Sequence, residues 1–398
     1  MNLRTIMLTS LTALAGATIA AQSPIKFSND NRASIGVYVE EIATGKVLEN
    51  YNADRTLPPA STMKSLTCAT ALNLLGGDYR YVTNFYLVGE KGNPNRSNLV
   101  IASGADPTTG SRHFKESSHM LDSVASHLEK MGVSYIGGNI VYDDKVLPDG
   151  GIVPYWEVDD IKYSYGVGLY PVNWMDNYFE GDYVMPSPPT YFRQQLIEVL
   201  SMNEINVEGD SLKFTAPTDT TLVFTHLSEP FSEIMHSLMV RSDNLMAEGT
   251  LRALAPAEPR DTAISLLKDF WKERGVDLTE TRILDGSGLS RANAVAPGQL
   301  GKMLTYMAKS DLAKEYVDLF ARVGKEGTVK SFLAKTRLDG RMALKTGSLS
   351  GVQCYAGYLL DKETGLPTHT VVIMIDHFYC ARNLVQKACE NYLLKKLP

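Results

Sequence analysis

Three short strings spread over most of this chain constrain its fold, because a functional set of them has to meet in space. They are Ser61-Thr62-Met63-Lys64, Ser242-Asp243-Asn244 and Lys345-Thr346-Gly347. Each string alone is weak evidence, since Ser-x-x-Lys also occurs at residues 23–26 and 265–268. Only the copy at Ser61 can begin an ordered set, because residues 265–268 follow the second string and residues 23–26 include a proline near the N-terminus. A fold that joins the first and last strings is therefore expected.

Local patterns predict the elements that carry these strings. Residues 34–51 alternate apolar and polar side chains around a Gly-containing turn, which is typical of a β-hairpin. Residues 61–75 follow two prolines and end before Gly76-Gly77, which predicts a helix with Ser61 at its N-terminus. Residues 342–360 and 368–375 are predicted to be two strands, followed by a helix over residues 381–394. Strands from both ends of the chain could then share one sheet.

The long stretch between the first two strings predicts an inserted lobe. It has its own strand patterns at residues 98–102 and 136–143 and a helical pattern at residues 115–131. We therefore expect a catalytic domain made of residues 22–83 and 223–398, interrupted by an inserted domain of residues 84–222.

Composition and the N-terminus indicate where the protein works. Residues 1–21 resemble a secretory signal peptide, with Arg4 before an apolar stretch and small residues at its end. This stretch is short and interrupted for a bilayer span, so we expect an exported protein of the periplasm or cell envelope with no transmembrane segment in the mature chain. The net charge of -6 and the lack of basic runs argue against nucleic acid. Cell wall or small peptides are better candidates.

The cysteines and histidines have no spacing that is typical of a metal site. Cys68 and Cys354 lie in apolar runs and are expected to be small buried side chains. Cys380 and Cys389 could pair in an exported protein, and the sequence leaves that open. No metal and no cofactor are predicted.

The first string contains the residue types that nucleophilic catalysis needs. A serine hydroxyl needs a base, and Lys64 follows Ser61 by three residues on the same face of the predicted helix. Lys64 can act as a base only if its pKa falls well below 10.4, which burial and the charge of Lys345 would both favour. Ser242 and Asn244 are expected to hold the Lys64 amine and the substrate amide, with Ser242 passing a proton to the leaving amine.

The third string is expected to bind the substrate. Gly347 has no side chain where another backbone must approach, which suits a substrate lying antiparallel along residues 345–349. Thr346 and Ser348 offer hydroxyls to a substrate carboxylate. The N–H groups of Ser61 and Ser348 would form an oxyanion hole.

Together with residues 285–293 (DGSGLSRAN) and Gly327-Thr328, the three strings resemble the low-molecular-mass class C penicillin-binding proteins. These are the S13 family of D-alanyl-D-alanine carboxypeptidases/endopeptidases. The resemblance implies an α+β fold, with a transpeptidase/β-lactamase-like domain of antiparallel sheet flanked by helices and an inserted second domain. It also implies hydrolysis of peptidoglycan stem peptides through an acyl-enzyme that β-lactams inhibit.

The resemblance also assigns roles to single residues. It implies that the catalytic residues are Ser61, Lys64, Ser242, Asn244 and Lys345, and that the substrate-binding residues include Thr346, Gly347 and Ser348. A loop containing Trp156, Asp159 and Asp160 resembles the stretch of the inserted domain that lines the stem-peptide side of the site. Trp156 could equally be a packing residue.

Two other functions fit part of this pattern. A β-lactamase shares the three strings, but the long insert and residues 285–293 favour the carboxypeptidase. A non-catalytic peptidoglycan-binding scaffold is disfavoured because all three strings are intact. The balance of carboxypeptidase and endopeptidase action is left open by the sequence.

Overall fold

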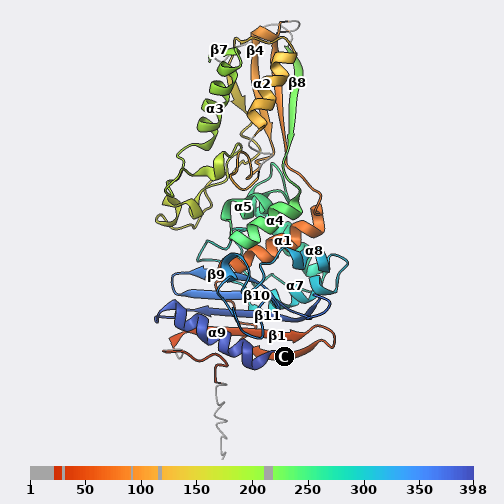
Figure 1. The fold of residues 1–398 in the computed structure, drawn as a ribbon, viewed down its shortest axis with the longest axis vertical. Coiled ribbons are helices and arrows are strands. Elements are labelled where there is room, and N and C mark those ends of the chain that lie inside the picture. Colours follow the sequence, from red (N-terminus) through yellow and green to blue (C-terminus); the bar gives the residue numbers. More distant parts are fainter. Residues whose placement is uncertain (1–21, 29–31, 91–92, 115–118, 210–217) are drawn as a thin grey trace, which may run out of the picture.

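The computed structural model describes residues 22–28, 32–90, 93–114, 119–209 and 218–398. The molecule is elongated, with a five-stranded sheet in one lobe and a four-stranded sheet in the other, at opposite ends of the long axis (Figure 1). The predicted signal peptide, residues 1–21, lies outside the described residues. Within the described ranges, no helix has the length and apolar character needed to cross a bilayer.

Both ends of the chain contribute to the five-stranded antiparallel sheet, as predicted. Its order is β2-β1-β11-β10-β9. Ser34 lies opposite Asp376, and the pairing of β1 with β11 continues to Glu41 opposite His369. The strands are β1 (Ser34–Glu41), β2 (Lys46–Tyr51), β9 (Met342–Leu349), β10 (Val352–Leu360) and β11 (Pro367–Asp376).

Two strand predictions were wrong for the same physical reason. Residues 342–360 form the hairpin β9-β10 rather than one strand, and the chain turns at Gly351, whose φ is 73°. Residues 136–143 were expected to be one strand but are divided between β5 (Tyr135–Ile136) and β6 (Ile140–Tyr142), which belong to different sheets. Glycines interrupt both runs, and glycine adopts turn conformations that other residues reach only at a cost.

Helices cover both faces of the five-stranded sheet (Figure 1). The C-terminal helix α9 (Arg382–Lys396) packs on one face through Val385, Cys389 and Leu393. The other face carries a larger core in which α1 (Met63–Leu75) is central, since every residue from Met63 to Leu72 is buried. The helices around it are α4 (Phe231–Arg241), α5 (Asn244–Arg252), α6 (Arg260–Glu273), α7 (Pro297–Lys309) and α8 (Ala313–Asp318).

The second lobe is built on the sheet β6-β4-β3-β8. Its core lies between this sheet and two helices, α2 (Met120–Lys130) and α3 (Pro188–Met202). The predicted helix over residues 115–131 begins at Met120 in the described part, because residues 115–118 lie outside it. The remaining strands are β3 (Val82–Glu90), β4 (Ser97–Ser103), β7 (Asn206–Val207) and β8 (Thr218–Leu227).

The chain enters and leaves this second lobe at one place. Val82 pairs with Leu227 at the ends of β3 and β8 nearest the five-stranded lobe. We propose that residues 84–222 form an inserted domain and that residues 22–83 and 223–398 form the catalytic domain. The pairing of the two connecting strands supports this division, because an insert whose ends are adjacent need not disturb its host.

Candidate active site

Ser61 and Lys64 meet at the start of α1. Ser61 lies in a one-turn 3-10 helix, η2 (Ala60–Thr62), which leads directly into α1. Lys64 Nζ donates a hydrogen bond to Ser61 Oγ over 3.0 Å. Ala60, just before Ser61, has a φ of 44°, a conformation that costs energy for a residue with a Cβ and often occurs at functional sites.

The Lys64 amine is buried and has three hydrogen-bond partners. Besides Ser61 Oγ, Nζ donates to Asn244 Oδ1 over 2.5 Å and to Ser287 O over 2.8 Å. Burial lowers the pKa of Lys64 from its usual value to about 8, although the carboxyl groups of Asp285 and others oppose the shift. A substantial share of the amine is therefore unprotonated slightly above neutral pH.

Lys345 forms a second buried amine beside the first. Its Nζ donates to Ser242 Oγ over 2.9 Å and to Thr346 O over 2.8 Å. Burial, and then the charge of Lys64, holds the pKa of Lys345 well below its usual value. The prediction that Lys345 helps to lower the pKa of Lys64 was wrong, because burial alone lowers it while nearby carboxyl groups raise it. The three strings are thus joined by side-chain hydrogen bonds, as the ordered set predicted.

The second string lies in the break between α4 and α5. Ser242 ends α4 with a left-handed φ of 64°. Asp243 caps α5 by accepting a hydrogen bond from Met246 N over 2.8 Å. Asn244 is the first residue of α5, and its Nδ2 donates to Tyr165 O in the inserted lobe over 2.6 Å. This break directs Ser242 toward Lys345 and Asn244 toward Lys64.

Gly347 allows the third string to lie against the turn that carries Ser61. A Cβ built on Gly347 would lie 2.6 Å from Pro59 O and 3.1 Å from Ser61 N. Another backbone does approach Gly347, as expected, but it is the protein's own and not a space left for a substrate. The close packing places the backbone nitrogen of Ser61 beside Gly347, the residue before Ser348.

The outer edge of β9 is open beside this turn. β9 is the last strand of the five-stranded sheet, and Leu344 N donates away from the sheet to Ala321 O over 3.0 Å. Because backbone groups alternate in direction along a strand, those of Thr346 and Ser348 face the same edge. A cavity of about 320 Å³ adjoins it, lined among others by Ser61, Ser242, Thr328, Thr346 and Ser348.

The three residues predicted from the inserted lobe are in different environments. Trp156 is buried against Val153 and Leu289, and its Nε1 donates to Asp285 Oδ2 over 2.9 Å, which favours the packing alternative. The Asp159 side chain is 88% exposed and pairs with Lys162.

Asp160 is connected more closely to the three strings than Asp159 is. It accepts a hydrogen bond from the Tyr165 hydroxyl over 3.2 Å. The carbonyl of the same tyrosine binds Asn244. Asp160 therefore lies on the side of the inserted lobe that contacts the second string.

Glu248 was not singled out from the sequence, and residues 285–293 were noted only for the family resemblance, with no role for Ser287. Glu248 Oε1 accepts from Gly286 N over 3.1 Å and from Ser287 N over 2.9 Å, which fixes the carbonyl that binds Lys64. Burial raises the pKa of Glu248 to about 7, and the charge of Asp285 adds to the shift. An acidic residue within the apolar run of α5 was the available signal, because glutamate is seldom fully buried without a partner.

Metal and disulfide chemistry find no support in the described part of the chain. No group of three or more His, Cys, Asp or Glu side chains there could hold a metal ion. The four cysteines are free, so Cys380 and Cys389 do not form the pair that the sequence left open. Cys68 and Cys354 are buried, as expected.

The chain matches the model of the D-Ala-D-Ala carboxypeptidase 3 (S13) family over residues 25–186 and 182–383. It belongs to this family. The family resemblance read from the three strings is thereby confirmed, and the chain is a serine-type D-Ala-D-Ala carboxypeptidase, a penicillin-binding hydrolase that works through an acyl-enzyme.

Individual relatives agree with this assignment. D-alanyl-D-alanine carboxypeptidase DacB of Haemophilus influenzae is 24% identical over 82% of this chain and 82% of the relative. D-alanyl-D-alanine carboxypeptidase of Actinomadura sp. is 23% identical over 82% of this chain and 75% of the relative.

Solved structures share the fold. Penicillin binding protein 4 (dacB) of H. influenzae superimposes with a TM-score of 0.81 at 20% identity, covering 93% of this chain and 97% of that one. A predatory endopeptidase of Bdellovibrio bacteriovorus, solved with an immunity protein, gives a TM-score of 0.59 at 19% identity, covering 91% and 93%. The predicted α+β class, with an antiparallel sheet flanked by helices, is confirmed.

Proposed function

We propose that this protein hydrolyses the terminal D-Ala-D-Ala bond of peptidoglycan stem peptides, with Ser61 as the nucleophile. The observation that carries the proposal is the hydrogen bond of Lys64 Nζ to Ser61 Oγ at 3.0 Å, made by an amine whose burial lowers its pKa to about 8. A serine beside an unprotonated amine can give up its proton as it attacks a carbonyl.

Acylation would proceed in two steps. Lys64 takes the Ser61 proton while Oγ bonds to the carbonyl carbon, and the N–H groups of Ser61 and Ser348 stabilise the negative oxygen that forms. The C–N bond then breaks, and Ser242 passes its proton to the departing amine, which leaves as D-Ala. Ser242 regains the proton that Lys64 took from Ser61, so the Lys64 amine is again free to act as a base. Lys345, hydrogen-bonded to Ser242 Oγ, keeps that hydroxyl in place for the transfer.

Deacylation would use water in the same site. Lys64 takes one proton from the water as its oxygen attacks the ester carbonyl. The C–O bond to Ser61 breaks, the hydroxyl regains a proton, and the shortened peptide leaves as a carboxylate. A β-lactam would form the same ester, but its amine stays attached to the acyl group and hinders the arrival of water.

The substrate is proposed to lie along the open edge of β9. Backbone groups of Thr346 and Ser348 face this edge, so a peptide can pair with them as an added antiparallel strand. The hydroxyls of Thr346 and Ser348, with Thr328 beside Thr346, would bind the terminal carboxylate. On the acyl side, Asp160 would attract an amino group on the stem peptide, with Asp159 further out and Trp156 supporting the loop from below.

The proposed substrate implies a place of action outside the cytoplasm. Peptidoglycan stem peptides are found there, and residues 1–21 have the pattern of a secretory signal. We therefore propose that the mature protein works in the periplasm or cell envelope, with no nucleic acid partner and with β-lactams as inhibitors.

The test combines muropeptides and labelled penicillin. Mass spectrometry should show loss of one alanine from pentapeptide muropeptides, and the penicillin adduct should map to the peptide that contains Ser61. Ser61→Ala should do neither. An adduct on Ser23 or Ser265 would contradict the site. Rapid hydrolysis of penicillin without release of alanine would favour the β-lactamase alternative.

A further inference from the structure

A second and larger cavity adjoins the proposed active site. It is a groove of about 1230 Å³, lined by α4, by α8 with its flanking residues, by Gly327 and Thr328, and by His113 and Phe114 of the second lobe. Thr328 also lines the cavity at Ser61, and its Oγ1 lies 2.7 Å from Thr346 Oγ1. The two cavities therefore meet beside the hydroxyls proposed to bind the carboxylate of the leaving residue.

The groove follows α4 from its first turn to Ser242. At the far end, Ser232 and the Glu315 carboxylate both lie against Gly77, since a Cβ there would be 3.4 Å from Ser232 Cβ and 1.8 Å from Glu315 Oε1. At the near end, a Cβ on Gly327 would be 2.6 Å from Val240 O. With 1.5 Å per residue, the 11 residues of α4 give the groove a length of about 16 Å.

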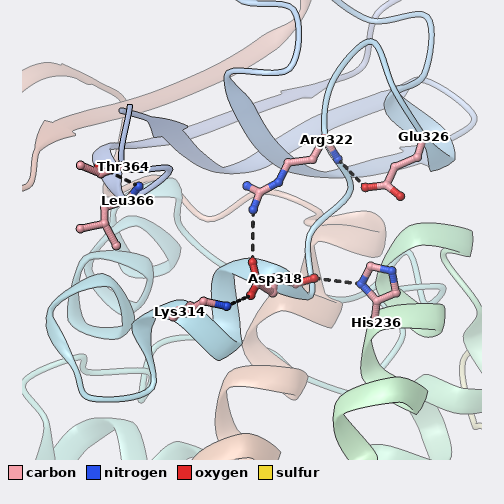
Figure 2. Close-up of polar contacts among 7 residues, drawn as sticks. All are labelled: His236, Lys314, Asp318, Arg322, Glu326, Thr364 and Leu366. Carbon is pink, nitrogen blue, oxygen red and sulfur yellow. Dashed lines mark hydrogen bonds and ion pairs between the residues drawn. The ribbon is translucent and has the colours of Figure 1, made fainter. Parts of the chain in front are cut away.

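Paired charges fix the middle of the groove (Figure 2). The Asp318 carboxylate accepts hydrogen bonds from Lys314 Nζ over 2.8 Å and from Arg322 over 3.3 Å. His236 Nδ1 lies 2.9 Å from Asp318 O, and Arg322 N donates to the Glu326 carboxylate over 3.2 Å. His236, Lys314 and Asp318 line the groove and are paired with one another, so this part of it is a wall rather than a site that needs a ligand.

The other charged side chains that line the groove include a positive one at the end near Ser242 and negative ones at the far end. The side chain of Arg241, next to Ser242, is exposed and makes no hydrogen bond or ion pair with other described residues. The side chains of Glu233 and Glu315 at the far end, and that of Asp311, which also lines the groove, likewise have no such partner among the described residues. A ligand that fits this pattern has a carboxylate near the scissile bond and an amine several bonds away.

We propose that this groove binds the leaving side of a branched or cross-linked peptide. The leaving residue's carboxylate lies between Thr328 and Arg241, and a cationic amine on its extended side chain pairs with Glu233 and Glu315. A single D-Ala occupies only the Thr328 end, whereas a longer leaving group gains contacts along α4 that contribute to transition-state binding. This inference rests on the proposed function, because it extends the same Ser61 site.

Three substrates with one acyl donor ending in D-Ala test the groove. Their leaving groups are D-Ala, D-Lys with a Lys-Gly dipeptide on its Nε, and D-Lys with acetyl-Ala-Gly there. The first leaving group is short, the second is long and cationic, and the third is long and uncharged. The kcat/KM values are measured for the wild type, for Glu233→Gln/Glu315→Gln and for Glu280→Gln, whose exposed carboxylate lies outside the groove.

The wild type should prefer the cationic extended substrate to the acetylated one. In the double variant, the ratio of the two kcat/KM values should fall about fivefold, as expected for partly exposed charge pairs. Glu280→Gln should keep the wild-type ratio. Equal kcat/KM values for the two extended substrates in the wild type would overturn the subsite, and so would a double variant in which the ratio of these two values is unchanged. In either case, D-Ala release and penicillin labelling by the wild type would still support the proposed function. A wild type that neither releases D-Ala nor labels with penicillin would remove the proposed function as well.

Discussion

Two buried lysines are hydrogen-bonded to the polar side chains of this site, Lys64 to Ser61 and Asn244, and Lys345 to Ser242. Their burial determines whether their amines are protonated. Lys64 and Lys345 are both fully buried, and each lies among hydroxyl, amide and carbonyl groups rather than in an ion pair. Burial disfavours the charged form of an amine, so both pKa values fall. At the residue scale, the apolar packing of α1 thus provides a base that an exposed lysine could not provide.

Replacing Lys64 by arginine separates charge from basicity. A guanidinium keeps the positive charge but does not give up its proton near neutral pH. We expect Lys64→Arg to lower the rate of penicillin acylation by about 10²–10⁴-fold, the range typical of a lost general base. Stopped-flow or gel-based labelling measures the rate, and circular dichroism checks that the variant is folded. Acylation near the wild-type rate would mean that Lys64 is structural.

The acylation rate should also depend on pH in a defined direction. The Lys64 pKa is lowered to about 8, so the free amine that acts as the base becomes the major form above that pH. Below it, the rate should fall by about tenfold for each pH unit, because the protonated amine cannot accept the serine proton. A rate that stays flat from pH 6 to 9 would exclude Lys64 as the base.

At the scale of elements, the site depends on how closely β9 approaches the η2 turn. Gly347→Ala places a methyl group 2.6 Å from Pro59 O, and backbone there cannot move without moving Ser61. We expect a loss of about 1–3 kcal/mol in stability, as for other overpacked sites, together with slower acylation.

Gly104→Ala is the matched control for this substitution. Its nearest contact would be Val82 O at 3.4 Å, which is ordinary van der Waals distance. Thermal unfolding and penicillin labelling of the two variants provide the comparison. Similar behaviour of both would show that the approach of β9 to η2 is not tight.

A second element-scale prediction concerns the loop of the inserted lobe. Asp160 is bound to Tyr165, which contacts Asn244, whereas Asp159 is exposed and pairs with Lys162. Asp160→Asn should therefore lower kcat/KM about five- to tenfold for stem peptides with a free amino group, a loss of about 1 kcal/mol as for one partly exposed hydrogen bond. Asp159→Asn should have less effect, and penicillin acylation should change in neither. Equal losses in both reactions would indicate an architectural role for the loop.

The elements that could be predicted from the sequence are those whose patterns lie within one short segment of the chain. The N-terminal hairpin, α1 and α9 have clear patterns and turn residues, and they were predicted. The turn at Gly351 was missed although Ser350-Gly351 is a turn signal, because residues 342–360 were treated as one run. The contacts of Lys64 with Ser287, and of Tyr165 with Asn244, join distant segments, so no local pattern could reveal them. The motifs identified the catalytic residues, but only the fold shows what surrounds them.

At the scale of the whole molecule, several contacts near the site join the inserted lobe to the catalytic lobe, among them the bond of Asn244 to Tyr165 and the ion pair of Arg291 with Glu157. Trp156 donates to Asp285, whose loop also presents Ser287 O to Lys64. Asp149 binds Arg252 of α5 over 2.9 Å and accepts from Arg260 N at the start of α6 over 2.9 Å. The insert therefore supports the loop and helix that position the Lys64 amine, in addition to any contact with substrate.

The Asp149 contact provides a test of this coupling between the lobes. Arg252 is only 5% exposed, so Asp149→Asn would leave a nearly buried cation without its partner charge. We expect the free energy of unfolding to fall by about 2 kcal/mol, less than for a fully buried pair because Asp149 itself is partly exposed. In a protein of this size that corresponds to a melting temperature lower by roughly 2–4 °C. Asp159→Asn, which breaks an exposed pair within the same lobe, should leave the melting temperature unchanged and is the control. If the two variants melt together, the lobes are not coupled through Asp149, and the remaining contacts of the loop at Asp285, with Trp156 and with Glu157 through Arg291, are the ones that join it to the insert.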